Sequence, residues 1–88
     1  MPTPRFPRNA TATGTLESGA GSIQGAVLLA GADAATAVIR TGGANGTIIA
    51  SLGAAIGLSA VWAPSFEVAF TDLHVTITGT TPKFTAFV

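Results

Sequence analysis

The sequence predicts an all-β protein, a compact antiparallel β-sandwich or small barrel with an extended N-terminal arm. Glycine interrupts the chain from Gly19 onward at intervals that are too short for most helices. Between these glycines, apolar and polar side chains alternate with the period of two that is typical of half-buried strands. Thirteen threonines suit a pleated surface on which the methyl group packs and the hydroxyl stays hydrated. We expect six to eight short strands with turns about ten residues apart.

The first 13 residues differ from the rest. They contain three of the five prolines and two of the four basic residues, and proline favours extended backbone at its own position and at the residue before it. We expect an extended arm over residues 1–13 and the sandwich domain over residues 14–88. Phe6 provides an apolar anchor on this arm, and Arg5 and Arg8 can meet carboxylates or carbonyl groups of another chain. The alternative is a frayed chain end.

The middle of the chain contains three apolar runs separated by turn residues. We expect strands at 23–30 and 35–40, joined by the loop 31–34. A third strand, 47–52, follows the glycine-rich connection 42–46. Short loops that contain glycine between such runs are typical of β-hairpins.

The clearest alternation lies near the C-terminus. Residues 66–70 and 73–77 both alternate, and we expect two strands with Thr71-Asp72 as the hairpin turn between them. A last strand follows at 84–88, where Phe84 lies on one face and Phe87 on the other. Large apolar groups on both faces indicate that both faces are covered.

Residues 41–66 contain no charged side chain, and within them residues 47–63 are mostly apolar. This length is at the lower limit for a membrane-spanning helix. Ala, Gly and Ser contribute weakly to insertion, however, and no Lys or Arg cluster flanks the segment. The alternative is a strand in which Leu58, Ala60 and Trp62 share one face, ended by Pro64.

Few residues carry chemistry. The formal net charge of zero disfavours nucleic acid as a partner, and the chain has no cysteine. His74, the only histidine, is expected to be a solvated strand residue, and Glu67 and Asp72 to be surface charges. The glycine-rich stretch 19–25 lacks the spacing of a phosphate-binding loop and is expected to be a flexible connection. We therefore predict no enzyme, with no catalytic, cofactor-binding or metal-binding residues.

The surface instead predicts assembly. The chain is 48% hydrophobic and only 9% charged, against about 25% charged in typical domains, so a neighbouring copy is the simplest cover. We expect a homo-oligomer with Trp62, Phe84 and Phe87 at or near the subunit contacts, while Phe6 reaches a second protein. The alternative for these aromatic residues is the core of the chain itself.

Two stretches carry a resemblance. Residues 28–40, LLAGADAATAVIR, and residues 70–80, FTDLHVTITGT, with the segments between and after them, resemble small virion proteins of tailed bacteriophages. The resemblance covers roughly residues 23–88. It implies a β-structured capsid decoration or cement protein, commonly a trimer, on the capsid surface of the virion, bound to the major capsid protein or other virion proteins. It carries no catalytic residues.

Two alternatives remain open at this point. The same sandwich suits an adaptor at the neck, tail or fibre base of the virion. A different class of protein, a small membrane protein for lysis, would use residues 47–63 as its span.

Overall fold

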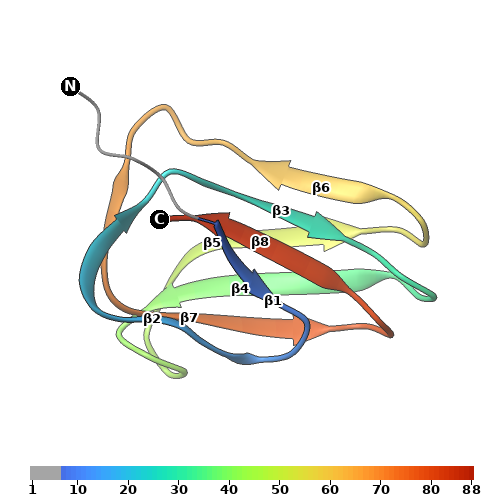
Figure 1. Cartoon of the computed structure of the whole chain (residues 1–88), viewed down its shortest axis with the longest axis horizontal. Coiled ribbons are helices and arrows are strands. Elements are labelled where there is room, and N and C mark those ends of the chain that lie inside the picture. Colours follow the sequence, from blue (N-terminus) through green and yellow to red (C-terminus); the bar gives the residue numbers. More distant parts are fainter. Residues whose placement is uncertain (1–6) are drawn as a thin grey trace.

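The computed structural model describes residues 7–88 and contains only strands, turns and loops in this range (Figure 1). The strands are β1 (Pro7–Ala10), β2 (Gly14–Ile23), β3 (Gly25–Leu29), β4 (Ala35–Thr41), β5 (Thr47–Ala54), β6 (Ser59–Trp62), β7 (Val68–Thr78) and β8 (Lys83–Phe87). They form two antiparallel four-stranded sheets packed face to face, in the orders β1-β8-β3-β6 and β2-β7-β4-β5. This confirms the predicted all-β sandwich.

The pairing follows a nested order. β4 pairs with β5, β3 with β6, β2 with β7 and β1 with β8. The chain is thus one long antiparallel hairpin wound across both layers, and every connection except that between β4 and β5 passes from one sheet to the other. Two four-stranded sheets connected in this way form a jelly roll.

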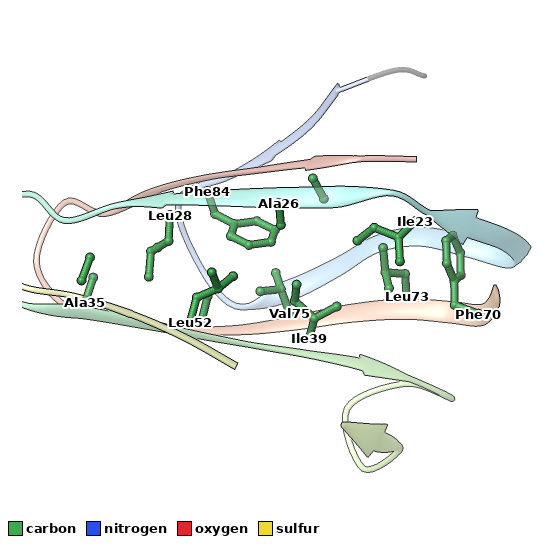
Figure 2. Packing of buried hydrophobic residues seen from close by; sticks show 13 residues of the cluster. Ile23, Ala26, Leu28, Ala35, Ile39, Leu52, Phe70, Leu73, Val75 and Phe84 are labelled. Atoms are coloured by element: carbon green, nitrogen blue, oxygen red, sulfur yellow. The ribbon is translucent and has the colours of Figure 1, made fainter. Parts of the chain in front are cut away.

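The core lies between the sheets, where side chains from both layers point toward each other (Figure 2). The largest fully buried side chains are Phe84, Ile23, Leu28, Ile39, Leu73 and Val75. Alanines fill much of the remaining space, and the molecule measures only 17 Å along its shortest axis. Small side chains at facing positions allow two sheets to pack closely.

The predicted hairpin turn at Thr71-Asp72 is wrong, because β7 runs without a break from Val68 to Thr78. Asp72 has a positive φ of 53°, and the register against β2 shifts beside it, as in a β-bulge. The Asp72 carboxylate accepts a hydrogen bond of 2.8 Å from the Gly19 amide. The left-handed backbone at Asp72 changes the alternation of β7, so that Phe70 and Leu73, three residues apart, are both buried. Asp72 is therefore a structural residue rather than only a surface charge.

The sandwich also begins earlier than expected. Pro7–Ala10 pairs with β8, so the described part of the segment expected as an arm joins the sheet as an edge strand, ahead of the boundary expected between residues 13 and 14. The stretch 19–25, expected as a flexible connection, lies mostly in β2 and ends at the start of β3. β1 owes its conformation to pairing with β8, and β2 to pairing with β7.

The helix considered for residues 47–63 is absent, because β5, a turn and β6 occupy this segment. Among residues 7–88 there is no helix of the length and hydropathy that crossing a bilayer requires.

Two glycines show how tightly the turns pack. A Cβ atom on Gly46, after the β4–β5 turn, would lie 1.9 Å from the carbonyl oxygen of Thr41. By contrast, a Cβ atom on Gly53 in β5 would have no neighbour within 4 Å. The first glycine is therefore required by close backbone approach, and the second is not.

Candidate functional site: an apolar sheet face and an uncharged edge

Polar side chains do not gather into a site in the part of the chain that the structure describes. No group of three or more His, Cys, Asp or Glu side chains there is arranged to hold a metal ion. The candidate functional features of residues 7–88 are therefore surfaces.

His74 corrects one expectation. It was expected to be solvated, but it is only 8% exposed, and its Nδ1 atom has no hydrogen-bond partner among residues 7–88. It lies opposite Thr15 on one side and Arg40 on the other, and these neighbouring strands cover it. Arg40 itself donates a hydrogen bond of 3.1 Å to the Thr76 hydroxyl. Around these residues, the outer face of the β2-β7-β4-β5 sheet is rich in threonine.

The outer face of the other sheet is apolar. Alternation along β3, β8 and β6 turns Ala26, Leu28, Phe84 and Ala86 into the core, so their strand neighbours point outward. We call the outward side chains of Val27, Leu29, Val61 and Phe87 the apolar face. Leu29 is 45% exposed, Val61 67% and Phe87 38%. The register places Val61 of β6 beside Val27 of β3, and Phe87 of β8 beside Gly25 of β3.

A groove of about 400 Å³ lies on this face. Gly25 forms part of its floor, and a Cβ atom there would lie 3.0 Å from the carbonyl oxygen of Trp62. The groove is lined by Gln24, Gly25, Ala26, Val27, Val61, Trp62, Ala63 and Phe87. Apart from Gln24, the lining is apolar, so the groove suits an apolar side chain of a partner better than a polar or charged ligand.

The two lateral edges of the sandwich differ (Figure 1). β1 and β2 form one edge, which carries Pro7, Arg8 and Glu17, and Arg8 Nε donates to Glu17 Oε2 at 2.8 Å across the two sheets. Register shifts interrupt β2. Proline, charge and bulges are the features by which proteins prevent strand addition at an edge.

The opposite edge consists of β5, the turn 55–58 and β6, and we call residues 47–62 the uncharged edge. It contains no charged residue and no proline. Ile48, Ile56 and Leu58 are exposed by 54%, 63% and 61%. Through Val61 and Trp62 this edge is continuous with the groove. Except for Phe66, the exposed large hydrophobic side chains of the described residues therefore lie on the apolar face or the uncharged edge.

The residues predicted to contact partners lie in different environments in the structure. Trp62 and Phe87 both line the groove, from strands of the same sheet. Trp62 lies opposite the buried Ala26 and also packs against the core, the alternative expected for it. The prediction that Phe84 lies at a subunit contact is wrong, because this side chain is 1% exposed and belongs to the core. Arg8 pairs within its own chain. Arg5 and Phe6 lie outside the described residues.

Sequence reasoning missed Val61, Ile56 and Gly25. The charge-free run 41–66 was a signal for the first two, since strands without charge at a sheet edge indicate a contact surface. No sequence signal pointed to Gly25, whose role depends on its register opposite Phe87.

Comparisons with protein-family models, with curated proteins and with solved structures give no match to this chain.

Proposed function

We propose that this chain is a structural protein that binds other protein subunits through its apolar face, and that it serves as a decoration or cement protein on the capsid of a tailed bacteriophage. The observation that carries the proposal is the apolar face with its groove. Val61 and Leu29 expose large apolar surfaces on neighbouring strands of one sheet, Val61 opposite Val27 and Leu29 two residues further along β3. A contiguous apolar surface on a small protein favours a protein partner.

The charge distribution supports this surface. By strand alternation, Lys83 is the charged residue that points outward from the β1-β8-β3-β6 sheet within the described range. Interfaces are depleted of charge at their centres and rich in aromatic residues. Phe87 lines the groove, is 38% exposed and supplies an aromatic anchor of the kind that dominates such contacts. Trp62 also lines the groove, while packing against the core.

The fold adds a second line of support. Jelly rolls occur in viral capsid proteins, and also in lectins and cupins. A fold does not define a function, so the choice among these protein classes depends on the groove. Its lining is apolar except for Gln24, which favours a protein contact over a carbohydrate or a metal-bound substrate.

A decoration protein acts by mass action. A subunit that binds only the assembled shell stabilises that shell by an amount that grows with its free concentration relative to its dissociation constant. Even small contacts add up when many copies bind to one particle. No bond-breaking chemistry is needed for this role.

The test uses virions encoded by the same genome, from which the chain has been deleted, with purified protein added back. We expect Val61→Glu to lower occupancy on the particle at least about tenfold, because a carboxylate in an apolar contact is desolvated without a partner. Thr15→Glu is the matched control, since Thr15 is also β-branched and exposed on an edge strand, but on the other sheet. We expect this variant to bind normally.

Quantitative mass spectrometry of the particles completes the test. Hundreds of copies per particle support a capsid decoration protein, whereas about a dozen copies or fewer support a neck, tail or fibre-base adaptor. Equal occupancy of the Val61→Glu and Thr15→Glu variants, or complete absence of the chain from particles, would overturn the proposal.

A further inference from the structure

A second surface carries an inference about self-association. β5 is the last strand of the β2-β7-β4-β5 sheet. One side of β5 pairs with β4, and from Ala35↔Ala54 to Ile39↔Ala50 this register is regular. On its other side, no strand pairs with β5 within residues 7–88. Every second residue of an edge strand directs its amide and carbonyl groups away from the sheet, in the plane of the sheet. These groups of β5 can therefore pair with another strand.

β5 lacks the features that protect an edge. It has eight residues, none of them charged and none proline. Its register shift lies near the start of the strand, between the partners Ile39 and Arg40, and leaves residues 50–54 regular. A strand of this kind at an exposed edge is predicted to pair with another chain.

We propose that β5 pairs antiparallel with β5 of a second copy of this chain, forming a two-fold symmetric dimer with a sheet continuous across the two copies. The choice of occupant follows from the two edges. The other open edge strands are β1, β2 and β6. β6 has only four residues, and a head-to-tail arrangement would require β5 to pair with the β1 or β2 edge of a neighbour, where Pro7, Glu17 and the bulge at Gly19 interrupt the ladder. A two-fold arrangement brings β5 against itself and places no like charges together.

The symmetry has a consequence for the apolar face. The two-fold axis of an antiparallel strand pair is perpendicular to the sheet, so both copies turn the same face in the same direction. Four strands of four or five residues give a face of roughly 300 Å², well below the roughly 800 Å² per partner of a standard interface. A dimer would double this area and bind a regular surface through two linked contacts.

That consequence depends on the proposed function, but dimerisation itself does not, and it is tested on the purified full chain alone. Sedimentation equilibrium over a concentration series measures the mass and the dissociation constant. We expect a dimer, and we expect Gly53→Lys to raise its dissociation constant at least about tenfold, because lysine on an edge strand opposes strand pairing. The backbone of Gly53 is unstrained, and a Cβ atom there has no neighbour within 4 Å.

Gly14→Lys is the matched control. Gly14 lies on the opposite edge strand β2, and a Cβ atom there also has no neighbour within 4 Å. We expect this variant to dimerise like the original chain. Hydrogen exchange provides a second measurement that needs no variant, because the amides of β5, but not those of β2, should exchange more slowly as the concentration rises.

Four results would overturn the inference: a monomer up to about 1 mM, a trimer, equal weakening by both variants, or protection of β5 only after virions are added. The last result would make another virion protein the occupant. A dimer that does not bind particles would instead refute the proposed function and leave the dimer standing.

Discussion

Phe84 and Phe87 lie three residues apart on β8, and they offer a test of which side of the strand is the core. Phe84 is 1% exposed and lies between the sheets, whereas Phe87 is 38% exposed and lies on the outer face. Truncating a fully buried phenylalanine to alanine costs about 3–5 kcal/mol, through lost burial and the cavity that remains. We expect this loss in the free energy of unfolding for Phe84→Ala and only about 1–2 kcal/mol for Phe87→Ala.

The size of the protein makes this difference decisive. At about 0.05–0.15 kcal/mol per residue, a chain of 88 residues has a total stability of roughly 4–13 kcal/mol. Phe84→Ala therefore removes a large fraction of the stability and can leave the chain unfolded. Phe84→Leu keeps the experiment measurable, because it retains most of the apolar volume and is expected to cost about 1–1.5 kcal/mol.

Urea unfolding followed by far-ultraviolet circular dichroism is the appropriate assay. Fluorescence of Trp62, the single tryptophan, is a useful second probe, but Trp62 and Phe87 line the same groove, so its signal also reports local change in the Phe87 variant. A loss for Phe87→Ala as large as that for Phe84→Ala, or a loss below about 1.5 kcal/mol for Phe84→Ala, would refute the assignment of the two faces.

Substitutions at three further features are tested by the same unfolding assay. Gly46→Ala should lower the free energy of unfolding by at least about 2 kcal/mol, because its Cβ would overlap the Thr41 carbonyl. Gly53→Ala should be neutral or stabilise by about 0.5 kcal/mol. Similar values for the two variants would contradict the packing of the turn. Asp72→Ala should lower the free energy of unfolding by about 1–2 kcal/mol, because the hydrogen bond from the Gly19 amide is lost and alanine disfavours a positive φ. Asp72→Asn should lower it by less than half of that, since asparagine tolerates this conformation. The side chains of the ion pair Arg8–Glu17 are 43% and 32% exposed. A double-mutant cycle should therefore give a coupling free energy below about 1 kcal/mol. A larger coupling that salt does not weaken would contradict its description as a surface ion pair.

The strands that bury one face were predictable from the sequence, because burial imposes a period of two on the side chains. The strands at 35–40 and 84–88 are examples. β2 was not predictable in this way, because it is an edge strand of mostly small residues that are largely exposed. Its conformation is set by pairing with β7, which is information that lies elsewhere in the chain.

Asp72 illustrates a second limit. Two apolar alternations of opposite phase met at Thr71-Asp72, and a turn was the local interpretation. A single residue with positive φ inside a strand, here Asp72, produces the same change of phase without reversing the chain. The turn and the continuous strand differ only in what pairs on either side. Here, β2 and β4 pair along β7 and keep it as one strand.

The candidate site was predictable in part. Trp62 and Phe87 are large apolar residues on strands with few charges, and both line the groove, although Trp62 also packs against the core. Phe84 was chosen for the same reason and is buried by the facing sheet, because residue type alone does not say which side of a strand meets the other layer. His74 was misjudged because the strands that cover it lie far from it in sequence.

The nested pairing also has a consequence for how the chain reaches its native state. The turn 42–46 closes β4 on β5 locally, whereas β1 meets β8 across almost the whole sequence. The entropy lost on closing a loop increases with its length, so we expect pairs to form from the centre outward, with β1 last. On the ribosome, β1 and β2 must then wait until β7 and β8 have been synthesised. Their apolar groups stay uncovered during that wait, and refolding should be slow for so small a domain.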